Sequence, residues 1–299
     1  MSAATELATE YVAGIAARAQ VSLWRDGFRR LRRNRLALAA ACFLTLLAVI
    51  CIITFFWTPY NPAVFVGVPY APPSLAHPFG LDEYGRDILS RMMQGAQISL
   101  AVGLGCAVIA VGVGVSLGLL AGYLRGWVDS VISTAINIFY SFPTILAALV
   151  LYIFIGPSVV NIMIAISLTV WMDMARLTRG QTLAIREREY VEAARAGGAR
   201  TGRILLAHVL PNALGPIIVQ ATYIIPAAIL TQAFLSFLGV GIPPPLADWG
   251  NIAGTDGLPA IRFAPHIVLP PAIALSLTLL AFNFFGDGLR DAFDPRQKR

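Results

Sequence analysis

Six long runs of apolar residues divide this chain, and they constrain its fold more than any other feature. The first run, residues 36–57, carries no charged side chain. A helix needs about 20 apolar residues, at 1.5 Å per residue, to cross the roughly 30 Å hydrocarbon core of a bilayer. The other runs are residues 98–124, 128–155, 159–175, 213–240 and 267–285. We therefore predict an all-α polytopic membrane protein with six transmembrane helices.

The composition excludes the common soluble classes of protein. Of the 299 residues, 57% are hydrophobic and only 13% are charged. Soluble domains carry about 25% charged residues, so this chain has too few to cover a soluble surface. The net charge of +6 is divided among short clusters between the apolar runs. That distribution favours a role in membrane orientation and argues against binding to nucleic acid.

The basic residues predict how the chain lies in the membrane. If six spans alternate in direction, 19 of the 22 Arg and Lys residues fall on one side. The other side holds only Arg86, Arg91 and Arg262. Because loops rich in Arg and Lys stay inside the cell, we expect both termini and residues 176–212 to be cytoplasmic. The first apolar run is too long for a cleaved signal peptide, so we interpret it as a retained anchor.

The chain divides into a leading segment, residues 1–35, a membrane domain, residues 36–290, and a tail, residues 291–299. In the leading segment, apolar side chains recur at helical spacing with arginines on the other faces. These residues are Val21, Trp24, Phe28 and Leu31, with Arg25, Arg29 and Arg32. The pattern fits an amphipathic helix at the cytoplasmic interface, and it equally fits arginines that only set the topology.

Motifs of catalysis or nucleotide binding are absent from the sequence. It contains no HExxH, no GxSxG and no GxxxxGK[ST], and Lys298 is the only lysine. We therefore predict no catalytic, cofactor-binding or metal-binding residue. Three cysteines in apolar runs, Cys42, Cys51 and Cys106, lack CxxC spacing and are interpreted as packing residues. Asp173 is expected to pair with a nearby Arg.

If a membrane protein of this kind takes part in transport, two energy sources stay open. Nucleotide-driven transport would require another chain to bind the nucleotide. An ion-driven secondary transporter is the alternative, and such folds commonly show internal repeats and charged sites at the midplane. The sequence shows neither a repeat nor charges within most of the spans, which weakens this alternative.

The longest polar stretch, residues 176–212, predicts a small helical hairpin. Arg188 and Glu192 are spaced i,i+4, and Glu192 and Arg195 are spaced i,i+3, so a short helix with paired charges is expected. Gly197 and Gly198 should end it, because glycine adopts a left-handed C-cap at little energetic cost.

A second short helix should follow in the same stretch. We expect Thr201 to cap it and Pro211 to stop it before the fifth span. The small side chains of Ala193 and Ala194 would let another surface approach closely. The hairpin is therefore either a docking element for a cytoplasmic partner or a solvated connection.

The same stretch resembles the EAA loop of ABC importer permeases. Glu192-Ala193-Ala194, then Gly198, then Leu210-Pro211 follow that family's pattern. His208 stands where the family has Ile. The resemblance implies that these residues form the coupling helix on which an ATPase docks, with Arg188 and Arg195 as possible supports.

Three further stretches resemble the C-type permease subunit of the dipeptide, oligopeptide and nickel ABC importers. They are His77-Pro-Phe-Gly-Leu-Asp-Glu-Tyr-Gly-Arg-Asp-Ile-Leu-Ser-Arg91, Phe234-Leu-Ser-Phe-Leu-Gly-Val-Gly-Ile-Pro-Pro-Pro with Asp248-Trp-Gly-Asn251, and Gly286-Asp-Gly-Leu-Arg-Asp-Ala-Phe-Asp-Pro295. The resemblance covers roughly residues 25–296. In the last stretch, Asp287 and Arg290 are further candidates to support the coupling loop.

The resemblance implies a type I importer in a bacterial inner membrane. Its expected partners are a second, homologous permease subunit, two ATP-binding subunits that hold ATP and Mg, an extracytoplasmic substrate-binding protein and membrane lipid. This chain would form half of the pathway and have no enzymatic activity. Di- or oligopeptides are the expected cargo, because no His, Cys and Asp cluster in the spans suggests a metal; glutathione-type peptides and nickel chelates stay open.

Overall fold

The computed structural model describes residue 29 and residues 31–293. Within those residues the protein is largely helical and contains no β-strand, as the sequence predicts. The amphipathic helix expected around residues 21–32 falls mostly outside the described residues, and so does the end of the tail.

The long helices of the described chain carry most of the apolar runs. They are α3 (Arg35–Thr54), α4 (Ile88–Leu124), α5 (Gly126–Tyr140), α6 (Thr144–Ile155), α7 (Val159–Arg186), α10 (Leu210–Phe237) and α12 (Leu269–Phe293). Short helical elements connect them: α8 (Glu189–Ala196), α9 (Thr201–Ile204), η1 (Leu205–Val209), α11 (Trp249–Asn251), η2 (Ile252–Gly257), η3 (Leu258–Ala260) and η4 (Pro265–Ile267). Among the described residues, five helices are long and apolar enough to cross a membrane, and α5 with α6 would make a sixth.

The third apolar run is not one continuous helix, which corrects the expectation for residues 128–155. It breaks into α5 and α6, which meet at 89°. Proline lacks an N–H, and its ring clashes with the carbonyl four residues earlier, so Pro143 cannot continue α5. Phe142, directly before it, is pushed away from helical geometry as well. Pro216 and Pro226, in contrast, lie inside an unbroken α10.

Several helices extend beyond the apolar runs that predicted them. α4 begins at Ile88, because the Asp87 carboxylate caps it by accepting from the Ser90 N–H at 2.8 Å. α7 runs on to Arg186, well past the apolar run that ends at residue 175. A run of apolar residues marks only the part of a helix that lies in the hydrocarbon. The length of a helix that projects into water is therefore underestimated from the sequence.

Three glycines bring the backbones of α4 and α7 together. Gly114, Gly118 and Gly122 are spaced four apart and lie on one face of α4. A Cβ on any of them would lie 2.6–2.8 Å from a carbonyl oxygen of α7, within residues 171–179. Small residues at this spacing are typical of close helix pairs in membranes. Gly103 of α4 similarly lies against Ile225 and Ile229 of α10, so α4, α7 and α10 form the tightly packed centre of the bundle.

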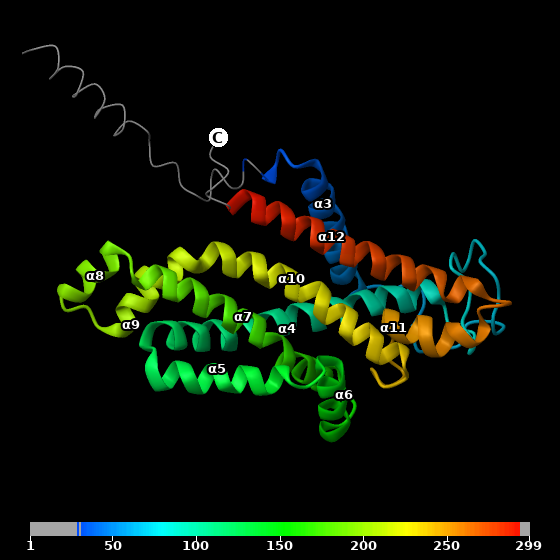
Figure 1. The fold of residues 1–299 in the computed structure, drawn as a ribbon. Coiled ribbons are helices and arrows are strands. Elements are labelled where there is room, and N and C mark those ends of the chain that lie inside the picture. Colours follow the sequence, from blue (N-terminus) through cyan, green and yellow to red (C-terminus); the bar gives the residue numbers. More distant parts are fainter. Residues whose placement is uncertain (1–28, 30, 294–299) are drawn as a thin grey trace, which may run out of the picture.

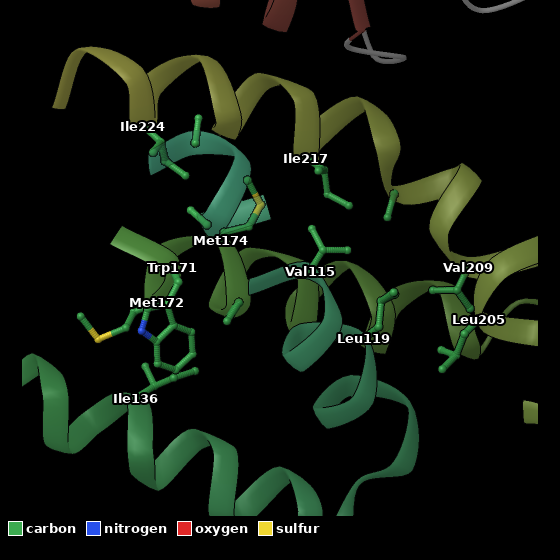
Figure 2. Packing of buried hydrophobic residues seen from close by; sticks show 14 of the residues in the cluster. Val115, Leu119, Ile136, Trp171, Met172, Met174, Leu205, Val209, Ile217 and Ile224 are labelled. Atoms are coloured by element: carbon green, nitrogen blue, oxygen red, sulfur yellow. The ribbon is translucent and has the colours of Figure 1, made fainter. Parts of the chain in front are cut away.

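A hydrophobic cluster fills the space between these central helices. Figure 2 shows Val115 and Leu119 from α4, Trp171 and Met174 from α7, and Ile217 from α10. The same cluster reaches Leu205 and Val209, which precede α10. Buried contacts thus continue from the middle of the bundle into the loop that carries α8.

The bundle has two ends of different construction (Figure 1). We call one the α8 end; it contains the start of α3, the end of α4, residues 187–211 and the end of α12. Gly288 packs against Ala37 there. We call the other the α11 end; it contains residues 55–87 and 238–268. α6 projects away from the long axis of the bundle, as expected from the sharp bend before it.

Candidate functional site: the α8 loop and the buried charges of the α11 end

α8 is a surface helix held by one buried side chain. Val191 is fully buried, whereas Glu189, Glu192 and Ala193 are exposed and Ala194 is half-buried. Val191 belongs to the same hydrophobic cluster as Ile204, Leu205 and Val209. The helix therefore presents a polar face with small side chains to the outside, while its inner face connects to the start of α10.

Tyr123, at the end of α4, joins α7 and α8. The Arg186 guanidinium donates to the Tyr123 carbonyl at 2.5 Å and lies 5.7 Å from its ring centroid. The Arg195 guanidinium lies 5.5 Å from the same ring. Cations within about 6 Å of an aromatic face are attracted by the ring quadrupole. The role of Tyr123 and Arg186 could not be predicted from the sequence, because it depends on contacts between distant segments.

Gly198 ends α8 in a Schellman motif. Its φ is +75°, the left-handed region that L side chains rarely adopt. The Gly198 N–H donates to the Arg195 carbonyl at 3.0 Å, and the Ala199 N–H donates to the Ala194 carbonyl at 3.1 Å. These two bonds define the motif. An added Cβ at Gly198 would meet nothing within 4 Å, so the backbone conformation alone demands glycine.

The charge pairs expected along α8 do not form. Within the described residues, Glu192 has no ion pair, and Arg188 and Arg195 have none either. Arg195 instead turns toward Tyr123. Glu192 thus leaves its carboxylate exposed, and its backbone N–H donates to the Arg188 carbonyl at 3.2 Å.

The connection from α8 to α10 corrects two expectations. Thr201 is the first residue of α9 and does not cap it, since the cap position is Arg200 and no side chain bonds there. Pro211 does not stop a helix before the fifth span. Residues 201–237 form one continuous helical rod, with a π-helical segment, η1, just before Leu210 and Pro211. The wider turn absorbs the hydrogen bond that Pro211 cannot donate.

The end of α12 packs against the first half of α10. Tyr223 Oη donates to the Asp287 carboxylate at 2.5 Å. Phe293 lies against Gly215. Arg290 borders a cavity of about 390 Å³ that is also lined by Leu177 and Tyr223. The end of α12 therefore contacts α10, the helix that continues the α8 loop, four or more residues beyond Pro211.

Asp173 does not have the partner expected from the sequence. Its carboxylate accepts a hydrogen bond from the Tyr140 hydroxyl, and within the described residues it forms no ion pair. Arg176, the nearest arginine in sequence, stacks on the Tyr140 ring at 4.4 Å. Sequence spacing favoured Arg176, but the end of α5 places an aromatic side chain between the two charges.

The α11 end encloses a cluster of buried charges. Asp82 and Arg91 are 0% and 2% exposed, and Arg86 and Asp256 are below 9%. The Arg91 guanidinium lies 2.5 Å from Asp256 and 3.3 Å from Asp82, and Arg86 lies 2.6 Å from Asp82. The cluster joins the segment before α4 to η2. Asp82, Arg86 and Arg91 lie in a recognised motif, but Asp256 lies in none, so the sequence could not predict the pairing.

Asp248 is the other buried carboxylate at this end. It caps α11 by accepting from the N–H groups of Gly250 and Asn251 at 2.7 and 3.0 Å, and it accepts from the Ser236 hydroxyl. Burial raises the pKa of Asp248 to about 6, although these hydrogen bonds oppose the shift. Trp249, next to it, donates its indole N–H to the Met92 carbonyl. Residues 248–251 are thus fastened to α4 and α10.

Two family models match the chain. The model described as "Binding-protein-dependent transport system inner membrane component" matches residues 114–299. The model described as "N-terminal TM domain of oligopeptide transport permease C" matches residues 22–73. The first match alone covers more than half of the chain.

Curated relatives are similar over nearly the whole length. The dipeptide transport system permease protein DppC of Bacillus subtilis is 43% identical over 285 residues, covering 94% of this chain and 88% of the relative. The oligopeptide transport system permease protein OppC of Escherichia coli is 42% identical over 93% of this chain and 92% of its own. The glutathione transport system permease protein GsiD of Pectobacterium atrosepticum is 39% identical, over 92% of both.

Among solved structures, the fold is similar to a chain of the MetNI methionine ABC transporter in an inward-facing conformation. The TM-score is 0.56 at 20% identity, over 68% of this chain and 96% of that chain. At that identity the likeness concerns the fold alone.

Proposed function

Since this chain belongs to the family of binding-protein-dependent transport system inner membrane components, we propose that it moves peptides through an ATP-driven importer and is coupled to ATPases by α8. The chain is a multi-pass membrane permease of the type I importer class, as its motifs indicated. We propose, in addition, which cargo it carries, which partners it has and which residues couple it to them.

The proposed cargo is a small peptide. Relatives that cover this chain almost fully are named for dipeptide, oligopeptide and glutathione transport. Glutathione is itself a tripeptide, so a backbone of amide bonds with charged ends is what these cargoes share. This common chemistry supports peptides over metal chelates.

The proposed partners follow from the importer class. They are a second permease subunit that completes the pathway, two ATP-binding subunits and a substrate-binding protein on the outer side. ATP and Mg would be bound and hydrolysed on the ATP-binding subunits. We place both termini and the α8 end in the cytoplasm, because 19 of 22 basic residues lie in segments assigned to that side.

The observation that carries the coupling proposal is the construction of α8. An exposed helix that is fixed by a single buried valine and ended by a left-handed glycine can be pushed as a unit. Force on its outer face would pass through Val191 to Leu205 and Val209, and along the continuous rod of residues 201–237 into α10. Closure of the ATPases would thus move a helix at the centre of the bundle.

The test uses the complete importer reconstituted in liposomes, with two substitutions in the loop. Glu192→Arg reverses the unpaired charge on the outer face, and Gly198→Val forces a side chain into the left-handed region. We expect each to lower peptide uptake and peptide-stimulated ATP hydrolysis by about five- to tenfold, the size typical of coupling between sites. Membrane insertion should be unchanged.

Two control substitutions match these changes. Asp291→Arg reverses an exposed charge at the same end but outside the loop, and Gly202→Ala adds a Cβ in α9 where nothing lies within 4 Å. Both controls should transport normally. Wild-type uptake by Glu192→Arg and Gly198→Val, at equal amounts of assembled complex, would contradict the coupling role of α8. Uptake that survives ATP depletion would contradict the proposed energy source.

A further inference from the structure

Exposed aromatic side chains gather on the α11 end, in the segment between α3 and α4 and in the turn before η4. The rings of Phe65 and Tyr84 contact at a centroid distance of 6.4 Å, and those of Tyr70 and Phe263 contact edge to face at 5.1 Å. Phe65 and Phe263 are 66% exposed, Tyr84 is 52% exposed, and Val68, between Phe65 and Tyr70 in the chain, is 74% exposed. We call these five residues the aromatic patch.

Backbone hydrogen bonds hold the two ring pairs side by side. The Val66 N–H donates to the Gly85 carbonyl at 2.8 Å, and the Tyr70 N–H donates to the Asp82 carbonyl at 3.0 Å. Because both bonds join the same two stretches of chain, the ring pairs belong to one surface.

The buried charges of the α11 end support the aromatic patch. The Arg86 guanidinium lies 4.7 Å from the centroid of the Tyr84 ring and donates to the Asp82 carboxylate at 2.6 Å. It also lies 3.5 Å from the Asp256 carboxylate. Arg86 cannot move without separating buried ions, which is strongly unfavourable. The ring above it is therefore fixed before any partner arrives, and a fixed ring loses little conformational entropy on binding.

The aromatic patch lies outside the hydrocarbon core of the membrane. Most of its residues belong to residues 58–87, which form neither a helix nor a strand (Figure 1). Exposed irregular backbone does not occur against lipid tails, because its N–H and C=O groups would lack hydrogen-bond partners. The distribution of Arg and Lys assigns this end to the outer side of the membrane. A contiguous apolar patch that faces water marks a contact site.

Little charge remains on the surface around the aromatic patch. Residues 58–87 contain four charged side chains, of which three are buried and one, Glu83, is half-buried. Arg262, next to Phe263, is exposed. A partner would therefore meet aromatic rings with one carboxylate and one guanidinium close by. An apolar centre with a polar rim is the usual anatomy of a contact between proteins.

We infer that the aromatic patch is the surface on which the substrate-binding protein docks, and that this contact is apolar rather than ionic; the inference rests on the proposed importer function. In that proposal the ATP-binding subunits dock at the α8 end, and the second permease lies beside the bundle in the membrane. The substrate-binding protein is the proposed partner that reaches the α11 end from outside. Its matching surface carries apolar side chains that cover the exposed rings.

The test measures the Kd between the complete importer in nanodiscs and its substrate-binding protein loaded with Ala-Ala. Phe65→Ala combined with Phe263→Ala should raise the Kd by about 30-fold, the loss typical of an interface hot spot. The maximal peptide-stimulated ATP hydrolysis should equal that of wild type, but more binding protein should be needed to reach it. A lower maximum with an unchanged Kd would show that the rings only support the structure, and would overturn the inference.

Two control substitutions match this change. Tyr84→Phe keeps the ring, and Phe56→Ala removes a phenylalanine that is 86% exposed but lies at the end of the first apolar run, outside the aromatic patch. Both should bind as wild type does. A wild-type Kd in the double variant would overturn this inference alone. A wild-type importer that neither binds the substrate-binding protein nor responds to it would contradict the proposed function as well.

Salt distinguishes an apolar contact from an ionic one. Between about 0.05 and about 0.5 M NaCl, the wild-type Kd should change by less than about twofold, although ionic attraction is strongly screened over that range. A Kd that rises steeply with salt would mean that charges carry the docking, and would overturn the inference.

Photo-crosslinking decides the matter even if the double variant does not assemble. In a chain whose three native cysteines are replaced, Val68→Cys is labelled with a benzophenone maleimide and assembled into the complete importer. Light should join this residue to the substrate-binding protein. Crosslinks confined to lipid or to the second permease would show that one of these covers the aromatic patch, and would overturn the inference.

Discussion

The two ends of the bundle differ in how deeply their ion pairs are buried. At the α11 end, Asp82, Arg91 and Asp256 are buried in direct contact. At the α8 end, Arg125 and Glu187 are 2.8 Å apart but 50% and 56% exposed, and the nearby pair Arg179 and Asp129 is 34% and 18% exposed. Buried ions need their partners, because an unpaired charge in a low dielectric is strongly destabilising. Exposed ions lose little when separated.

This difference indicates which end can change its contacts. The α11 end is held together by buried ion pairs, by the buried Trp249 and by the helix cap at Asp248. Moving one of its segments would therefore expose buried side chains of the others. The α8 end rests on Val191 and on cation–ring contacts at Tyr123, while its polar groups already face water. Rearrangement there requires little desolvation or loss of ion pairs. The α8 end is the one suited to a moving partner.

The largest effect that tests this comparison is expected at Asp256. Asp256→Ala leaves Arg91 buried with only Asp82 nearby, so the free energy of unfolding should fall by about 3–5 kcal/mol. The measurement is denaturant unfolding of the purified chain in mixed micelles, read by circular dichroism. A loss below about 1 kcal/mol would mean that the cluster is hydrated, and the contrast between the ends would fail.

The second effect is a pH dependence that originates at Asp248. Its pKa is about 6 in the folded protein against an ordinary value of 3.8, so the folded state holds the proton more tightly. The stabilisation from this proton is complete below about pH 4 and is lost as the pH rises to about 6. The decrease should reach about 3 kcal/mol.

Comparison of wild type with Asp248→Asn isolates this contribution. The asparagine keeps a cap oxygen but does not titrate, so the difference in unfolding free energy between the two proteins should change from pH 4 to pH 7. Parallel pH profiles would show that Asp248 is ionised throughout, in a more polar environment than the structure indicates.

A smaller effect is expected at the glycine that ends α8. Gly198→Ala should destabilise the chain by about 1–2 kcal/mol, because a left-handed residue with a Cβ is strained. Gly202→Ala, in the same loop and with equally free space, should be neutral or stabilising by up to about 1 kcal/mol. Unfolding in mixed micelles measures both. Equal effects of the two substitutions would remove the conformational reason for Gly198.

The smallest effect is expected from the exposed pair of the α8 end. Glu187→Ala removes the partner of Arg125, and the unfolding free energy should change by less than about 1 kcal/mol. Raising the salt concentration should weaken even that contribution. A loss as large as the one expected for Asp256→Ala would show that the two ends do not differ in the way proposed.

Local sequence signals predicted part of the α8 loop correctly and part of it incorrectly. The glycine at the end of α8 and its positive φ followed from the chemistry of helix ends, which involves neighbouring residues only. The pairing of Glu192 with Arg188 or Arg195 followed from spacing, but Arg195 found a better contact at Tyr123. Pro211 was expected to stop a helix, yet η1 absorbs the missing hydrogen bond.

The sequence by itself determined the helical class, the number and position of the apolar runs, and the motifs that identify the family. These features depend on hydrophobicity over about 20 residues and on residues in fixed order, which require no knowledge of the fold. The tertiary structure decided the right-angle elbow after α5, the partner of Asp173 and the pairing of Arg91 with Asp256. Each of these depends on segments far apart in sequence, and short-range patterns contain no information about which of them meet.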